Sequence, residues 1–370
     1  MEKAYKYRIY PNKKQKDLLA KTFGCCRFIY NYFLNRRIEL YQNEQKSLTY
    51  NQCSLELTKL KQELEWLRDP DKCALQNTLK DLENAYKKFF KEHTGFPKFK
   101  SKKTNRFSYR TSITGSNIAY CGNHIKLPKL GMVKTRNKLV PQGRILNATI
   151  SQEPSGKYYV SLCCTDIETN PLPKTNESIG IDLGIKEYCT FSDGVKISNP
   201  KCLKKSLSKL AKLQSELSRK SSGSNNRNKA RIKVARMHEK ITNQRKDFLQ
   251  KLSTDLIQKY DLICVEYLHV KDMIENQHLS REISDVSWSE FVRMLEYKAK
   301  WYGKKLVKVD QYFASSQKCC ICGHPNEELK KLTVRNWICP QCGTVHDRDI
   351  NASINILNEG RQTAGTAGIA

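Results

Sequence analysis

The sequence predicts a multidomain α+β protein. We expect an N-terminal β-barrel with an inserted helical unit, then an α/β domain that carries a helical hairpin and a cysteine module. Three observations predict this. Apolar residues recur at three- and four-residue intervals through most of residues 11–92. Short alternating segments with hairpin turns follow, up to about residue 168. Beyond a polar, proline-containing linker, compact apolar strands alternate with long helical stretches.

The first half of the chain reads as one strand, three helices and a set of hairpins. Tyr and Ile alternate with Lys and Arg before Pro11, which is typical of a short strand. The N-terminal strand is expected to complete the barrel that the later hairpins begin. The expected elements are a strand over 4–10, helices starting at Asn12, over 51–67 and over 73–91, and hairpins over 118–127 and 148–162, the last turning at Ser155 and Gly156.

The second half alternates strands and helices. A long helical stretch with a narrow apolar seam is interrupted by a Ser- and Asn-rich segment, which predicts an antiparallel helical hairpin. The expected elements are a strand over 178–184, a strand pair over 187–197, the hairpin over 201–258 with its break at 221–228, strands over 262–268 and 304–310, a helix over 285–303 capped by Asp285, and a last helix from Ile350 to Asn358 that ends at Gly360.

Charge points to a polyanionic partner. The 370 residues include 66 Lys and Arg against 37 Asp and Glu, a formal net charge of +29. Nucleic acid is the first expectation and an anionic membrane surface the second. No apolar run approaches the ~18 residues that a membrane span needs, so no span is expected. Fifteen cysteines, several in adjacent pairs, indicate reduced thiols in an intracellular protein rather than a disulfide framework.

Two cysteine pairs have the spacing of a metal site. Cys319 and Cys322 precede Cys339 and Cys342 by sixteen residues, and a glycine follows each pair. Four thiolates form the closed tetrahedral shell of a structural Zn²⁺, so we expect one zinc in a ribbon-like module. Unmetallated cysteines or a redox pair are the alternatives, and Cys320 could replace Cys319 as a ligand.

Three acidic residues stand where an acid is unusual. Asp182 and Glu266 interrupt otherwise apolar strands, and Asp349 lies at the start of the last helix. Acids in this strand–strand–helix order are typical of a ribonuclease H-like fold, where they could hold two divalent cations for phosphodiester hydrolysis. The alternatives are a buried salt bridge for Glu266 and a plain helix cap for Asp349. Asp347 is the other acid that could complete such a site.

Two segments are strongly basic. Residues 95–110 hold six cations and no acid, interleaved with aromatic residues, and residues 201–251 hold sixteen cations against three acids. Such surfaces can follow phosphates and stack bases, although charged helix faces are often only solvated. The candidate nucleic-acid contacts are Lys100, Lys102 and Lys103 in the first segment, and Arg231, Lys233 and Arg236 in the second.

The chain resembles the TnpB family, the RNA-guided DNA endonucleases of bacterial and archaeal insertion sequences and relatives of the type V CRISPR effectors. The likeness covers nearly the whole chain. The motifs that carry it are KYRIYPNKKQ (6–15), FGCCRFIYNYFLNRR (23–37), GFPKFKSKK (95–103), GIDLGIKEYCTFSDG (180–194), SRKSSGSNNRNKARIKVARMHEKITNQRKDFLQKLS (218–253), SWSEF (287–291), SSQKCCICG (315–323) and WICPQCGTVHDRDINASINI (337–356).

This resemblance implies a RuvC-like triad at Asp182, Glu266 and Asp349, with two Mg²⁺ or Mn²⁺ ions. It implies a guide RNA from the transposon end and double-stranded target DNA, which is cut beside a short adjacent motif. Lys72 and Gln76, one helical turn apart, are similar in placement to family residues near that motif. A monomer with one RNA, in the prokaryotic cytoplasm and at the nucleoid while acting, is expected.

The resemblance also implies a division into domains. The expected parts are a wedge-like barrel (1–10 and 93–168), a helical recognition unit (11–92), a linker (169–177), a RuvC-like nuclease (178–314 and 347–359), a zinc-binding module (315–346) and a C-terminal tail (360–370). A cleavage-inactive, repressor-like RNA-guided DNA-binding protein is the alternative function. A DDE-type transposase is a weaker one, since no separate helix-turn-helix domain is evident.

Overall fold

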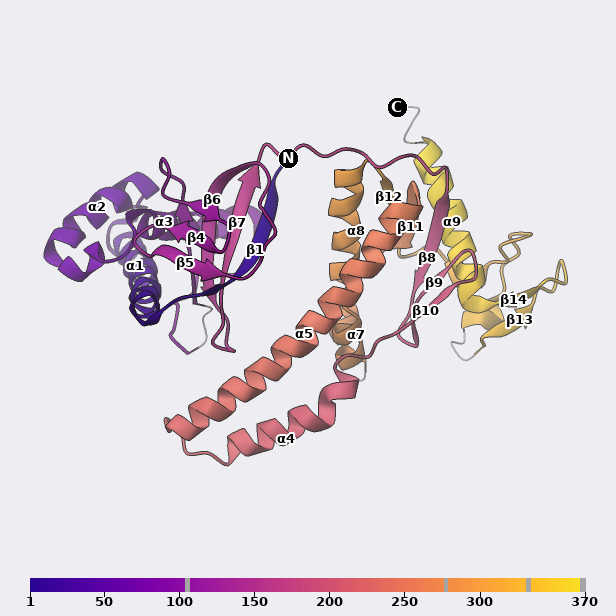
Figure 1. The fold of residues 1–370 in the computed structure, drawn as a ribbon. Coiled ribbons are helices and arrows are strands. Elements are labelled where there is room, and N and C mark those ends of the chain that lie inside the picture. The colour runs from indigo at the N-terminus through magenta and orange to yellow at the C-terminus, as the bar shows by residue number, and fades with distance from the viewer. Residues whose placement is uncertain (104–106, 276–278, 331–333, 367–370) are drawn as a thin grey trace. The chain divides into compact units, whose positions relative to one another are not determined.

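The structure is a computed structural model that describes residues 1–103, 107–275, 279–330 and 334–366. The chain forms two compact units, Met1–Glu168 and Thr169–Ala370, coloured from indigo to magenta and from magenta to yellow in Figure 1. None of the described helices is long and apolar enough to cross a membrane.

The first unit contains a seven-stranded antiparallel sheet in the order β2-β6-β7-β1-β5-β4-β3. β1 lies between β7 and β5, so the N-terminal strand is part of this sheet, as the sequence predicts. β2 and β3 lie at the two ends of the strand order, and closure into a barrel stays a prediction. The strands are β1 (Lys3–Tyr10), β2 (Phe107–Ser112), β3 (Ala119–Cys121), β4 (His124–Leu127), β5 (Gly131–Thr135), β6 (Arg144–Gln152) and β7 (Tyr158–Thr165).

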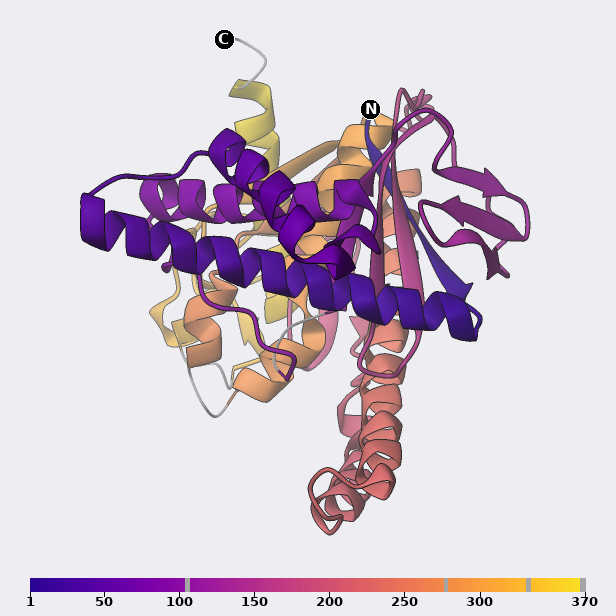
Figure 2. The ribbon, with the colours of Figure 1, turned by 90° about the vertical axis from the view of Figure 1, so that its left-hand side faces the viewer.

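The first unit also has three helices: α1 (Lys13–Glu44) and α3 (Lys72–Glu92) pack against β2 and each other, and α2 (Tyr50–Glu63) packs against α3. α1 begins where expected because Asn12 and Gln15 form a reciprocal capping box. α1 runs as one long helix beside α3, as the indigo and purple ribbons of Figure 2 show.

The second unit is built on a five-stranded sheet in the order β10-β9-β8-β11-β12. β8, β11 and β12 are parallel, whereas β9 and β10 are antiparallel additions beside β8. Val265 on β11 pairs with Ile181 on β8, so the residues that follow, Glu266 and Asp182, lie at the same edge of the sheet. The strands are β8 (Ser178–Leu183), β9 (Glu187–Phe191), β10 (Lys196–Ser198), β11 (Leu262–Glu266) and β12 (Lys305–Val309).

The predicted helical hairpin is confirmed. Leu210, Met237 and Ile241 form its buried seam between α4 and α5, and the two helices extend together from the sheet in Figure 1. The helices of this unit are α4 (Leu207–Ser218), α5 (Asn225–Lys259), α6 (Val270–Glu275), α7 (Ser280–Val286), α8 (Trp288–Tyr302) and α9 (Arg348–Thr366).

The expected cap at Asp285 is wrong. α8 begins at Trp288 after Ser287, whereas Asp285 lies inside the short helix α7. Its carboxylate accepts hydrogen bonds from the backbone N–H of Leu203, at 3.0 and 3.2 Å, and from Arg245 at 2.6 Å. Asp285 therefore fastens the start of the hairpin to α7, a long-range role that no local sequence pattern encodes.

The expected helix end at Gly360 is also wrong, because α9 continues to Thr366. A Cβ atom at Gly360 would collide with the side chain of Cys264 on β11. The glycine therefore allows α9 to approach the sheet closely, and it does not terminate the helix.

A buried lysine fastens the expected linker segment, residues 169–177, to the rest of the second unit. Lys304, whose side chain is 2% exposed, pairs with Asp261 and donates a hydrogen bond to the carbonyl of Pro173. Asp261 also accepts hydrogen bonds from the backbone N–H groups of Thr175 and Asn176, at 2.8 and 2.7 Å. The hydrogen bond from Lys304, together with these backbone donors, lowers the pKa of Asp261 from 3.8 to about 2.

The ion pair between Lys304 and Asp261 should make the stability of the folded chain depend on pH. Because the pKa of Asp261 is depressed in the folded chain, its stabilisation is complete above the ordinary value of 3.8 and disappears as the pH falls toward about 2. Asp261→Asn is therefore expected to lower the thermal midpoint at neutral pH and to match the unmodified chain near pH 2. Equal midpoints throughout a calorimetric pH series would contradict the role given to this pair.

Candidate active site

The three predicted acids come from three elements of the second unit. Asp182 lies on β8, Glu266 ends β11 and Asp349 lies in the first turn of α9. α9 packs directly on β8, because Gly180 leaves no side chain between that strand and the backbone of Ser353. This close contact brings the start of α9 to the edge of the sheet where the strand acids lie.

The charges of these acids act on one another. The surrounding protein desolvates Asp182, and the charges of Glu266 and Asp349 add to that effect, so the pKa of Asp182 is raised well above its ordinary value. Desolvation raises the pKa of Glu266 to about 7, although the backbone N–H of Leu183 donates to its Oε1 at 3.0 Å. Desolvated carboxylates that repel one another are typical of sites that receive cations, and their oxygen donors suit Mg²⁺ or Mn²⁺.

Asp349 has a cationic partner that the sequence analysis missed. Arg335, between the two cysteine pairs, donates to the Asp349 carboxylate at 3.0 and 3.3 Å. Its guanidinium also opposes the rise in the pKa of Asp182. The three carboxylates are not tightly clustered: within the described part of the chain, three or more metal-ligating side chains come within 4.8 Å of one another only at the cysteines. An arginine in a cysteine module gives no sequence signal that it will face a distant acid.

The helix-cap alternative applies to Asp347 and not to Asp349. Asp347 Oδ1 accepts hydrogen bonds from the backbone N–H groups of Asp349 and Ile350, at 3.0 and 3.1 Å. Its other oxygen pairs with Lys196 at 2.6 Å. Asp347 therefore caps α9, whereas the Asp349 carboxylate does not cap the helix and pairs with Arg335.

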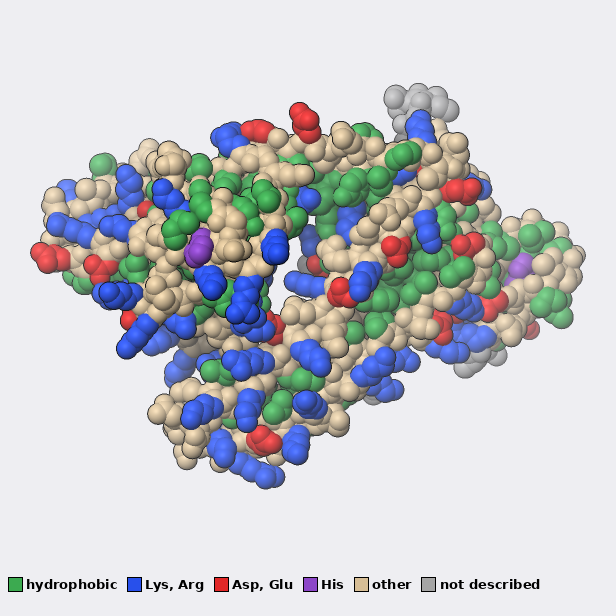
Figure 3. All heavy atoms as spheres, viewed as in Figure 1, with side chains coloured by type: hydrophobic (Ala, Val, Ile, Leu, Met, Phe, Trp, Pro, Cys, Tyr) green, Lys and Arg blue, Asp and Glu red, His purple; other side chains and the backbone are tan. Residues whose placement is uncertain are grey.

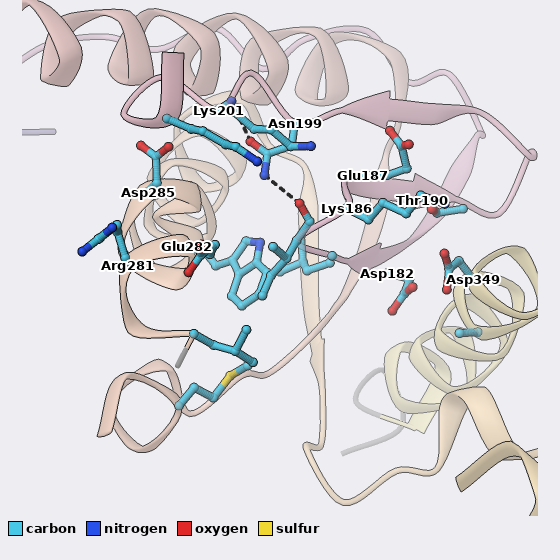
Figure 4. A pocket seen from close by; sticks show the side chains of 18 of the residues that line it. Asp182, Lys186, Glu187, Thr190, Asn199, Lys201, Arg281, Glu282, Asp285 and Asp349 are labelled. Atoms are coloured by element: carbon cyan, nitrogen blue, oxygen red, sulfur yellow. Dashed lines mark hydrogen bonds between the residues drawn. The ribbon is translucent and has the colours of Figure 1, made fainter. Parts of the chain in front are cut away.

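Two of the three acids, Asp182 and Asp349, line a cavity of about 930 Å³. Asp182 and Asp349 lie together at one end of it in Figure 4, while Lys201, Arg281 and Asp285 lie toward the other end. Each end of the cavity carries both signs of charge, because Arg335 pairs with Asp349 at one end and Asp285 lies near Lys201 and Arg281 at the other. This volume falls within the range of about 300–1,000 Å³ that is usual for ligand sites.

The four predicted cysteines come together. The sulfur atoms of Cys319, Cys322, Cys339 and Cys342 all lie within 4.8 Å of one another, so the donor set fits a tetrahedral zinc. Cys320 is not part of this group: its backbone N–H donates to Asn351, and its sulfur lies 3.9 Å from a ring nitrogen of His346.

The cysteine module is fastened to the helix that carries Asp349. Asn351 donates to the carbonyl of Lys318 at 2.7 Å, and Asn355 donates to the carbonyls of Ser315 and Lys318 at 2.7 and 2.8 Å. Both asparagines are buried on α9. The fold of the module and the position of α9 are therefore coupled.

The predicted nucleic-acid contacts differ in their surroundings. Lys100 is half-buried, with its ammonium 3.8 Å from the ring centre of Tyr30. The other candidates, Lys72, Gln76, Lys102, Lys103, Arg231, Lys233 and Arg236, are all exposed. Lys72 and Gln76 both lie on α3, and Figure 3 shows Lys and Arg side chains gathered over the α4–α5 hairpin.

Three protein-family descriptions match parts of this chain. A family described as a probable transposase, OrfB of IS605, matches residues 161–277. The Cas12f1-like TNB domain matches residues 288–356, which include the cysteine module. A helix-turn-helix domain associated with OrfB matches residues 1–46, where this structure has strand β1 followed by the single long helix α1.

Whole-chain relatives agree with these matches. A Streptomyces pristinaespiralis protein, provisionally named an RNA-guided DNA endonuclease, is 40% identical, with 97% of this chain and 90% of that protein covered. An Escherichia coli protein with the same provisional name, InsQ, is 33% identical over 96% and 92% of the two chains. A Cas12f1 chain, solved with its guide RNA and target DNA, shares the fold with a TM-score of 0.55 at 14% identity, covering 97% of this chain and 99% of that one. The chain therefore belongs to the TnpB family, the OrfB proteins of IS605-type elements.

Proposed function

We propose that this protein is an RNA-guided, metal-dependent DNA endonuclease of an insertion sequence. The observation that carries the proposal is the placement of Asp182, Glu266 and Asp349, whose charges interact at one edge of the second sheet. The topology of that unit supports a RuvC-like, ribonuclease H-like domain. Two of the acids lie on the parallel strands β8 and β11, and the third lies on the last helix, α9.

The acids would hold two Mg²⁺ or Mn²⁺ ions, which activate water and stabilise the leaving oxygen when phosphodiesters are hydrolysed. The chain's own groups prepare this site. The backbone N–H of Leu183 orients Glu266, and the cap at Asp347 fixes the turn that carries Asp349. Arg335 balances part of the negative charge and holds the Asp349 carboxylate in place.

Sequence choice would come from pairing between a guide RNA and target DNA, while the protein binds backbones through its basic surfaces. We propose that the wedge-like first unit and the α4–α5 hairpin hold the RNA and the heteroduplex. Lys72 and Gln76 on α3 would lie near the target-adjacent motif, and one protein would act with one RNA. The proposed zinc at the four cysteines would keep the module attached to α9.

A cleavage-inactive RNA-guided DNA-binding protein is the second candidate function. The presence of all three acids, with interacting charges, favours cleavage over it. The deciding experiment is to sequence the RNA that copurifies with the protein and then to incubate the complex with a guide-matched duplex and Mg²⁺. Cutting that requires the match establishes the endonuclease; tight, matched binding without cutting indicates the repressor-like alternative.

RNA affinity is expected to be mainly electrostatic. Each lost phosphate contact should make the slope of log K against log salt shallower by about 0.7 for single-stranded and about 0.9 for duplex nucleic acid. Replacing Lys100, Lys102 and Lys103 by Ala should remove about two contacts, because Lys100 packs on Tyr30. Replacing the three hairpin cations Arg231, Lys233 and Arg236 by Ala should remove fewer than three phosphate contacts, since these positions do not share one helix face.

Filter binding across a salt series measures this slope. Lys21→Ala is the matched control, because Lys21 pairs with Asp69 at 3.0 Å and its charge is already compensated. Unchanged slopes for both triple variants would show that these segments are only solvated surfaces. A loss of binding capacity without a change of slope would indicate misfolding.

A further inference from the structure

Trp288 has no role in the site described so far. It opens α8 within the SWSEF segment and lines the same 930 Å³ cavity as Asp182 and Asp349. Its side chain is 2% exposed, yet its indole N–H has no hydrogen-bond acceptor among the described residues. A buried donor without an acceptor is costly, so its presence beside a cavity indicates an acceptor that arrives with a ligand.

The cavity around Trp288 has a mixed chemistry. Apolar side chains form much of its wall: Leu183, Ile185, Leu203, Leu207, Met273 and Leu279. Lys201, Lys204 and Arg281 also line it. Glu282 and Asp285 are the acids nearby, and Arg245 compensates Asp285. A partly apolar cavity with a donor and cations suits a flat ring that carries acceptors and is joined to phosphates.

The loop beside Trp288 is held in place. Asn199 donates to the carbonyl of Ile185 at 2.8 Å, a bond drawn in Figure 4, and the backbone N–H of Lys201 donates to Asn199 at 2.9 Å. These bonds join the segment after β8 to the segment after β10. The cavity wall is therefore braced before any ligand binds, which lowers the cost of ordering it.

We infer that this part of the cavity holds one unstacked nucleobase of the DNA strand being cut, next to the bond that is hydrolysed. The indole N–H of Trp288 donates to a carbonyl oxygen or ring nitrogen of that base, and Lys201, Lys204 and Arg281 bind its flanking phosphates. Every DNA base offers such an acceptor, so the contact positions the strand with little sequence preference. The inference rests on the proposed endonuclease function, and it requires the strand to enter single-stranded.

The test combines an abasic scan with Trp288→Phe, which keeps the ring and removes the donor. Single-turnover cutting is measured on guide-matched targets that carry one abasic site at successive positions around the cut. The unmodified chain should be slowed about tenfold at one position, the loss typical of one buried hydrogen bond. Trp288→Phe should be slowed about tenfold on intact DNA, and the abasic site at that position should slow it no further.

Trp301→Phe is the matched control, because Trp301 lies on the same helix, does not line the cavity and packs in a tilted arrangement against the ring of Tyr297. This variant should cut intact DNA as fast as the unmodified chain, and the abasic site should slow it by the same factor. The inference would be overturned if the unmodified chain cut all abasic targets at the same rate. It would also be overturned if Trp288→Phe and the abasic site together slowed cutting by the product of their separate effects. The abasic scan of the unmodified chain needs no variant, so it tests the inference even if Trp288→Phe fails to fold. Failure of the unmodified chain to cut intact, matched DNA would instead overturn the endonuclease function and this inference with it.

Discussion

Replacing Asp182, Glu266 or Asp349 by its amide is expected to slow Mg²⁺-dependent cutting of a guide-matched duplex by about a hundredfold or more. Each amide keeps the size of the side chain but removes a negative charge from the proposed metal site. The effects should not add, because the three acids are proposed to act as one unit. Binding of RNA and target should persist, since it depends on the basic surfaces.

Cleavage is measured beside filter binding for each variant. Asp347→Asn is the matched control, because Asp347 lies two residues before Asp349 but caps α9, a role that an asparagine can also fill. It should retain most of the activity. Normal cutting by Asp349→Asn, together with an inactive Asp347→Asn, would move the third acid of the site to Asp347.

Loss of Cys339 is expected to have the second large effect. Replacing it by Ser should reduce the metal content from about one zinc per chain, since a structural zinc contributes much of the folding free energy of a small module. Nuclease activity should fall in parallel, because Asn351 and Asn355 attach the module to α9, and Arg335 joins it to Asp349. Metal analysis and calorimetry measure the first effect, and the cleavage assay the second.

Cys320→Ser provides the control for this experiment. Cys320 neighbours the same module but lies outside the group of four sulfur atoms, so its loss should leave the zinc content unchanged. Zinc loss from Cys320→Ser and not from Cys339→Ser would mean a different ligand set. Protein purified under reducing conditions with no zinc but full activity would contradict a structural zinc altogether.

Local patterns were sufficient for most elements of the fold. The capping box at Asn12, the turn at Ser155 and Gly156 and the apolar seam of the α4–α5 hairpin all involve residues close in sequence or a simple periodicity. The same logic failed at Asp285 and Gly360, whose residue types suggested a cap and a helix end. Their partners, Arg245 and Cys264, lie about 40 and 100 residues away, beyond the reach of any local rule.

The sequence by itself determined which residues carry unusual chemistry. An acid inside an apolar strand and a paired cysteine spacing are visible without a fold, because burying a charge or clustering thiols needs a specific reason. Only the tertiary structure decided how these residues are partnered: that Arg335 faces Asp349, that Asp347 takes the helix cap, and that Trp288 lines the cavity beside the acids with an unpaired donor. Such partnerships depend on distances and desolvation between elements far apart in the chain, and the packing of α9 and α8 around the sheet sets both.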